Sequence, residues 1–188
     1  MTKNLSDIVD INFRYQRSAR IDHDTNIENV KSFIVHETAK NTVSRILSNT
    51  KENNTFTITG PYGGGKSSLA IYLASLFDKD VKLKKFTREH FQKNITLPES
   101  DILKSKNAIV LKIVGQKSDP IEDLKELLTK AAQEHKWEKQ PPKISSSNNL
   151  KALITSFENV FESLNQQKDS LVLIIDESHY MTSPDAVK

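Results

Sequence analysis

The chain has 188 residues, of which 27% are charged and 36% hydrophobic, and its net charge is +3. This length fits one domain, or one domain and part of another, and the small net charge gives no global argument for nucleic-acid binding. The absence of cysteine excludes a disulfide framework and a thiolate metal site. No apolar run approaches the ~20 residues that span a bilayer, and the N-terminus lacks a secretory apolar core. We therefore expect a cytoplasmic protein.

The first fifty residues predict an arm followed by two helices. Residues 1–28 are polar and without strong periodicity, so we expect an N-terminal arm there and a domain over residues 29–188. Apolar residues recur at helical spacing from Ile27 to Leu47. His36 and Thr38 interrupt this pattern, which predicts a short helix and then a longer helix that ends near Ser48.

A glycine-rich loop lies between a predicted strand and a predicted buried helix. Residues 55–59 (TFTIT) are β-branched or aromatic and predict a strand. Residues 68–77 (SLAIYLASLF) are small or apolar on nearly all faces, which predicts a helix packed on several sides. The eight residues 60–67 (GPYGGGKS) match the pattern G-x-x-x-x-G-K-[ST] and contain four of the five glycines of the chain. Such a loop, placed between a strand and a helix, binds phosphate through its backbone amides.

Each position of this loop has an expected role. The lysine ammonium is expected to reach the β- and γ-phosphates, and the serine hydroxyl that follows it is expected to bind Mg²⁺. The residues expected to bind nucleotide are Gly60, Pro61, Tyr62, Gly63, Gly64, Gly65, Lys66, Ser67 and Ser68, of which Ser67 is also the expected metal ligand.

The middle of the chain predicts helices around one strand. Residues 79–107 suggest two short helical pieces separated near Pro98, and their basic side chains are interpreted as a solvated surface rather than a phosphate-backbone contact. Residues 108–114 predict a strand, in which Lys112 favours an edge position. A helix start at residues 119–122 (DPIE), a loop at 140–147 and a second amphipathic helix over about 148–166 follow.

The second half of the expected site follows the run 171–175 (LVLII). This run predicts a strand covered on both faces, and it ends in Asp176 and Glu177. Because ligand sites in parallel sheets lie at the carboxyl ends of strands, a parallel neighbour would bring Asp176 to the edge that carries the glycine loop. Asp176 would then hold Mg²⁺ opposite Ser67, and Glu177 would orient a water for in-line attack as the catalytic residue.

Residues 55–77 and 171–177 together resemble the Walker A and Walker B segments of P-loop NTPases. The adjacent acidic pair resembles the additional-strand, catalytic-glutamate division, and most closely AAA+, origin-recognition-type or STAND ATPases. The resemblance implies an α/β fold, a three-layer sandwich with a mostly parallel sheet of order 5-1-4-3-2 and residues 108–114 as the edge strand. It also implies ATP and Mg²⁺ as cofactors, Mg-dependent ATP hydrolysis, and adenine bordered by the backbone near Phe33–His36.

The resemblance further implies partners and a missing part. An AAA+ core has two more strands, a sensor, an arginine finger and usually a lid after the Walker B strand, so we expect a truncated domain and a poorly active chain. The expected role is the ATP-binding module of a larger assembly, for example in DNA transactions or bacterial defence, with nucleic acid as a candidate partner. Residues 176–179 (DESH) also have the form of the superfamily 2 helicase box. A slow nucleotide-switch signalling module is a further alternative, and a small-molecule kinase ranks last.

Overall fold

The computed structural model describes residues 19–48, 54–94, 96, 103, 108–115, 120–134, 150–167 and 170–177. The second helical piece expected near Pro98, the loop at 140–147 and the histidine of the helicase-type box lie outside these residues. Within them are the helices α1 (Ile27–Lys31), α2 (Glu37–Leu47), α3 (Lys66–Leu76), α4 (Val81–Gln92), α6 (Pro120–Glu134) and α7 (Leu150–Gln167), and the strands β1 (Ala108–Val114) and β2 (Ser170–Asp176). None of the described helices is both long and apolar enough to cross a membrane.

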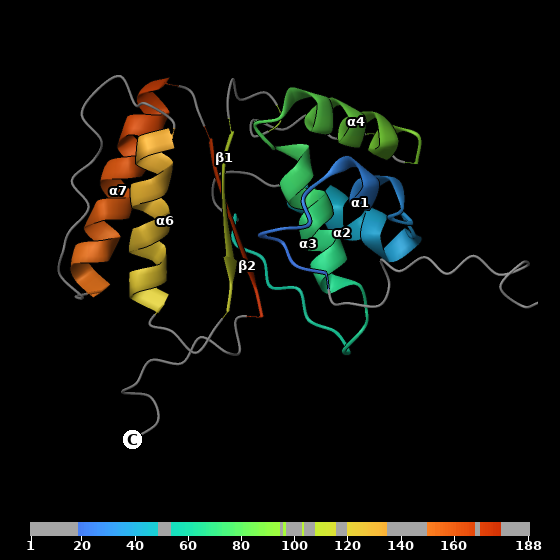
Figure 1. The fold of residues 1–188 in the computed structure, drawn as a ribbon, viewed down its shortest axis with the longest axis horizontal. Helices are drawn as coiled ribbons and strands as arrows, with labels where there is room; N and C mark the ends of the chain where they lie inside the picture. Colours follow the sequence, from blue (N-terminus) through green and yellow to red (C-terminus); the bar gives the residue numbers. More distant parts are fainter. Residues whose placement is uncertain are drawn as a thin grey trace, which may run out of the picture.

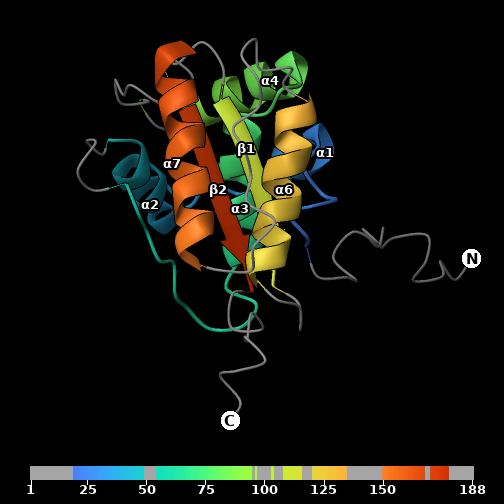
Figure 2. The same cartoon turned by 90° about the vertical axis from the view of Figure 1, so that its left-hand side faces the viewer.

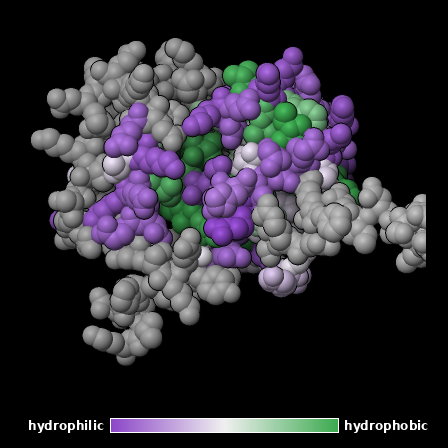
Figure 3. Space-filling view, in the orientation of Figure 1, coloured by the Kyte–Doolittle hydropathy of each residue, from purple (hydrophilic) through white to green (hydrophobic). Residues whose placement is uncertain are grey.

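The fold is mixed α/β, with helices on both faces of a parallel pair of strands (Figures 1 and 2). β1 and β2 pair in register from Ala108 opposite Ser170 to Val114 opposite Asp176. Helices α1 to α4 lie on one side of the sheet, and α6 and α7 lie on the other (Figure 1). On the face drawn in Figure 3, hydrophobic surface lies where Figure 1 places the sheet and again in the α4 region, with hydrophilic surface around both areas.

Alternation along the strands divides the apolar side chains between two cores. Because successive strand residues point to opposite faces, the even-numbered residues of both strands pack against α1 to α4, and the odd-numbered ones face α6 and α7. The first core receives Ala108, Val110, Val172 and Ile174 from the sheet. The second core receives Ile109, Leu111 and Leu171. Whether a strand residue has an even or an odd number therefore shows which group of helices it faces.

Helix α3 is buried on almost every side, as its sequence predicts. Seven of its 11 residues are buried, and Tyr72 is fully so. The Tyr72 ring stacks on Phe33 at a centroid distance of 4.7 Å and is tilted against Phe91 at 5.6 Å. Burial of large aromatic side chains contributes about 1.5–3 kcal/mol each. These contacts hold α3 between the sheet, α1 and α4.

The predicted interruption between the first two helices is confirmed. Helix α1 begins after Asn26, whose side chain accepts a hydrogen bond from the Asn29 amide. Helix α2 begins after His36, whose Nδ1 accepts from the Ala39 amide at 3.3 Å, and it ends before Ser48. The His36 ring thus caps a helix, which explains why the helical pattern breaks at this residue.

The prediction of a strand at residues 55–59 is wrong. Residues 54–60 have no regular secondary structure, and Phe56 and Ile58 remain 36% and 38% exposed. β-Branched and aromatic residues favour a strand because they fit a paired, half-buried surface. No described strand lies beside this segment, which runs on the side of β2 that faces away from β1 (Figure 2).

The prediction that the 171–175 strand is covered on both faces is confirmed only in part: Leu171 packs in the second core, but the rest of that face is partly exposed. Leu173 and Ile175 of β2 are 40% and 42% exposed, whereas Ile109 and Leu111 of β1 are buried. Within the described part of the chain, β2 has a strand neighbour on one edge only. The same holds for β1, in agreement with the edge position predicted from Lys112, and that lysine is half-buried against Thr25.

The pairing of Tyr72 with His90 predicts a pH-dependent stability. The Tyr72 hydroxyl lies 3.0 Å from His90 Nδ1. Burial lowers the pKa of His90 below its ordinary 6.5, and the charge of Lys93 lowers it further. Because the folded state then binds this proton less tightly than the unfolded state, the free energy of unfolding should fall as the pH drops from about 7 to about 5. Urea unfolding at both pH values measures this change.

The control for this prediction is His90→Gln, which cannot gain a proton. Its free energy of unfolding should fall less than that of the wild type over the same pH interval. Equal falls in the two proteins would show that His90 does not contribute to the pH dependence.

Candidate functional site

The glycine loop has the backbone geometry that its composition predicts. Gly63 and Gly65 have φ angles of +75° and +77°, in the left-handed region that favours glycine. The Gly64 amide donates to the Pro61 carbonyl at 3.2 Å, and a Cβ at Gly64 would lie 3.0 Å from that oxygen. The loop therefore needs glycine at these three positions, two for their φ angles and one for close backbone approach.

The loop leads into a helix N-terminus that no side chain caps. Gly65 is the N-cap of α3 and makes no side-chain hydrogen bond, whereas α1, α2 and α4 are capped by Asn26, His36 and Asp80. The first-turn amides of a helix have no partner within the helix, and they carry its positive dipole end. An anion can therefore take the position at α3 that an oxygen or nitrogen atom of a side chain occupies at the other three helices.

The Lys66 ammonium lies over the loop that precedes it. Its Nζ donates to the carbonyl of Gly60 at 3.0 Å and to that of Pro61 at 2.8 Å. These two bonds hold the positive charge at the mouth of the loop, beside the uncapped amides of α3. Neutral carbonyls are weaker partners for an ammonium than phosphate oxygens, because the full negative charge of a phosphate adds a Coulombic attraction that a carbonyl dipole lacks. The lysine is thus held in place and can exchange these carbonyls for an anion.

The remaining loop residues differ in exposure. Ser67 and Ser68, in the first turn of α3, are half-buried, and the Ser67 hydroxyl has no hydrogen-bond partner among the described residues. Tyr62 is 94% exposed at the tip of the loop. A free hydroxyl next to the lysine fits the role expected of a magnesium ligand.

The acidic pair follows β2 directly. Asp176 is the last residue of β2 and, being even-numbered, belongs to the face on which α3 packs. Its Oδ1 accepts a hydrogen bond from the Glu177 amide at 3.0 Å, and its carbonyl accepts from Gly115 at 2.8 Å. Glu177 is exposed and has a φ of +53°. Among the described residues, it is the only non-glycine residue with a positive φ. Such strained residues cluster at functional sites.

The structure brings the two halves to the same end of the molecule but does not join them. Figures 1 and 2 both place the glycine loop and the carboxyl end of β2 at the lower end of the molecule as drawn. No hydrogen bond or ion pair links the loop with Asp176 or Glu177 in the described part of the chain. Among the described residues, no group of three or more histidine, aspartate or glutamate side chains is arranged so that it could hold a metal ion. One hydroxyl and one carboxylate still suit Mg²⁺, which keeps several waters and uses few protein ligands.

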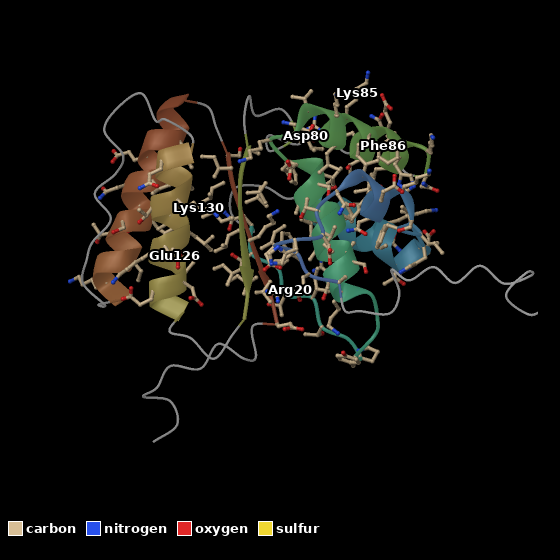
Figure 4. The ribbon with its side chains drawn as sticks, viewed as in Figure 1. Arg20, Asp80, Lys85, Phe86, Glu126 and Lys130 are labelled. Carbon is tan, nitrogen blue, oxygen red and sulfur yellow. The ribbon has the colours of Figure 1, made fainter. Side chains whose placement is uncertain are left out.

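The sequence did not single out Arg20, which lies beside the lower half of the sheet in Figure 4. It is one of several arginines in a segment without periodicity, so nothing in the pattern distinguishes it. The signal that could have found it is the acidic and β-turn-prone composition of the residues that follow, 21–25 (IDHDT).

Comparison of the chain with family models, with curated proteins and with solved structures finds no match.

The left-handed backbone at Gly65 predicts a stability difference between two glycine substitutions. Gly65→Ala should lower the free energy of unfolding by about 1–2 kcal/mol, because its φ of +77° is costly for an L-residue. Gly60→Ala is the matched control, since Gly60 lacks a positive φ and a Cβ there meets nothing within 4 Å. Urea unfolding measures both, and equal stabilities of the two variants would contradict the loop geometry.

Proposed function

We propose that this protein is an Mg-dependent ATPase of the P-loop type, in which the glycine loop binds the phosphates of ATP. The observation that carries the proposal is the uncapped N-terminus of α3. A loop with two glycines in the left-handed region precedes it, and the Lys66 ammonium is hydrogen-bonded to a carbonyl of that loop. Three sources of positive potential (amides, helix dipole and lysine) meet at one loop. Phosphate is the ligand that this combination binds best.

The proposed fold is a P-loop sandwich of the catalytic-glutamate division. In the order 5-1-4-3-2, residues 54–60 take the place of strand 1, β1 that of strand 2 and β2 that of strand 3. Strand 4 of that order lies between residues 54–60 and β2. In the structure these two segments lie on the same side of β1, with no described strand between them. This order also makes β1 the edge strand beside β2, as the observed parallel pairing allows. Both observations support the proposed order.

The proposed chemistry assigns a role to each residue of the site. Lys66 and the amides of the first turn of α3 bind the β- and γ-phosphates and compensate their charge. Ser67 and Asp176 would hold Mg²⁺, and the bound ion would act as a Lewis acid that stabilises negative charge on the phosphates. Glu177 accepts a proton from the attacking water and orients that water. The backbone near Phe33–His36 is proposed to border the adenine.

In this proposal the protein works in the cytoplasm within a larger assembly of subunits or domains, and hydrolysis drives or switches that assembly. Nucleic acid is one candidate partner. A helicase-type role would make the ATPase rate rise on addition of DNA or RNA, whereas a slow nucleotide switch would show low single-turnover rates.

Lys66→Ala tests phosphate binding. The change removes an ammonium that makes charge-assisted bonds worth about 1.5–3 kcal/mol each, so we expect ATP affinity to fall about 100-fold or more. Isothermal titration calorimetry with Mg-ATP measures the dissociation constant. Lys82→Ala, an exposed lysine in α4, is the matched control and should bind ATP like the wild type. An unchanged affinity in Lys66→Ala would rule out this loop as the phosphate site.

Glu177→Gln tests the role of the carboxylate. The amide keeps the size of the side chain but cannot accept the proton of the attacking water, so turnover should fall about 100-fold while ATP affinity changes less than about twofold. Glu126→Gln, at an exposed position of α6, is the control. Parallel loss of binding and turnover would instead assign Glu177 a structural role.

A further inference from the structure

Helix α4 carries a positive charge that the rest of the chain lacks. Its four cationic side chains and one anionic side chain give it a net charge of +3. This is also the net charge of the whole chain, so the charges of all other residues cancel. The helix follows the C-terminal end of α3, whereas the glycine loop precedes the N-terminal end of α3 (Figure 1). The excess positive charge therefore lies on one helix, away from the proposed ATP site.

The inner face of α4 holds the helix on the core. Leu83, Thr87 and Phe91 are buried, and the Phe91 ring packs against Tyr72 of α3. The carboxylate of Asp80 caps the first turn, because it accepts hydrogen bonds from two amides of that turn at 2.8 and 3.4 Å. A capped and packed helix keeps its outer side chains in fixed positions relative to one another.

The outer face of α4 carries three lysines that we call the basic face of α4. Lys82, Lys85 and Lys93 are exposed. Helical geometry places them within about 80° of one another around the axis and along about 16 Å of its length. Figure 4 shows Lys85 projecting from α4 away from α3. The basic face is thus a short row of ammonium groups turned toward the solvent.

Little of this charge is neutralised within the chain. Lys85 Nζ lies 3.9 Å from a carboxylate oxygen of Glu89, and both side chains are more than half exposed. An exposed pair of this length adds little stability and opens at little cost. Among the described residues, the ammonium groups of Lys82 and Lys93 form neither a hydrogen bond nor an ion pair. The basic face can therefore receive an external anion.

The other side chains of α4 limit the kind of anion. Phe86 stacks on His90 and Phe91 lies in the first core, so the rings of α4 are engaged in the fold and do not provide a platform for single-stranded bases. A helix that lies on a membrane turns its large apolar side chains toward the lipid. In α4 the apolar face packs on the core, and of its large apolar side chains Val81 alone is mostly exposed. What remains is recognition through charge.

We propose that the basic face of α4 binds the sugar-phosphate backbone of double-stranded DNA, independently of base sequence. A duplex carries one negative charge per about 1.7 Å of its axis, so a row of lysines can neutralise several phosphates at once. The sequence alone favoured a solvated surface for this segment, and the structure adds that the lysines share one exposed face. Because this face is separate from the proposed ATP site, the inference does not depend on the proposed function.

Binding of a fluorescein-labelled DNA duplex, measured by fluorescence anisotropy without nucleotide and at several salt concentrations, tests the inference. We expect the triple variant Lys82→Gln, Lys85→Gln and Lys93→Gln to bind about tenfold or more weakly at low salt. The slope of log affinity against log salt should become less steep by about 2.7, because each phosphate contact contributes about 0.9. Lys82→Gln alone should reduce the slope by about 0.9.

A charge-matched variant is the control. Arg45→Gln, Lys130→Gln and Lys151→Gln together remove the same amount of charge from exposed positions of α2, α6 and α7. This variant should bind the duplex like the wild type, and urea unfolding shows whether both triple variants keep their fold. Lys66→Ala should also bind the duplex like the wild type, since the glycine loop is not part of the basic face.

Three results would overturn the inference: a wild type that does not bind the duplex at low salt, an unchanged affinity in the basic-face variant, or an equal loss in the two triple variants. Phosphatidylserine vesicles and poly-glutamate are measured at the same concentration of negative charge. Tighter binding to either of them than to the duplex would assign the face to a membrane or to an acidic protein, and would also overturn it. A protein that binds the duplex but not ATP would overturn the proposed function alone.

Discussion

The N-terminus of α3 is the constraint on which the rest of the structure depends. A helix end without a capping side chain leaves several amides unpaired, which is unfavourable unless water or a ligand satisfies them. Here the end is exposed, the loop before it is left-handed at two glycines, and Lys66 hangs over it. The remainder of α3 is buried between the sheet, α1 and α4. Rigid burial of the helix body fixes the position of its open end, and a fixed anion site is what phosphate chemistry requires.

The sheet provides the second fixed point. Because β1 and β2 run parallel, their carboxyl ends lie together, and the Gly115 amide bonds to the carbonyl of Asp176 at that edge. Alternation places Asp176 on the α3 side of the sheet. Within the described residues the sheet has two strands, one face of β2 is partly exposed and segment 54–60 is not paired, so this part of the sheet is narrower than the resemblance implies. The glycine loop and the uncapped end of α3 are therefore formed, whereas the acidic pair lies at the same end of the molecule without a hydrogen bond or ion pair to the loop among the described residues.

The sequence predicts best what local chemistry decides. The break at His36, the all-round burial of α3 and the strand at 108–114 follow from capping, composition and β-branching, and the structure confirms them. The strand at 55–59 and the full cover of 171–175 depend on neighbours that lie far away in the chain, and propensity alone carries no information about those neighbours. The turn at residues 20–25 was not predicted for a related reason: it is held by the buried Ile21 and by a bond from Lys112 to Thr25, and Lys112 is distant in sequence. The backbone geometry of the glycine loop could be predicted because the spacing of its glycines marks the positions that need a positive φ or a close backbone approach.

The most direct measurement is a titration of ¹⁵N-labelled protein with Mg-ATP, followed by the amide resonances of the loop and of the first turn of α3. If the open helix end is a phosphate site, the amides of Gly63, Gly64, Gly65, Lys66, Ser67 and Ser68 will show the largest and saturable shifts. Shifts confined to other surfaces, such as the basic face of α4, or no saturable shift at all would contradict the assignment of this loop as the nucleotide site.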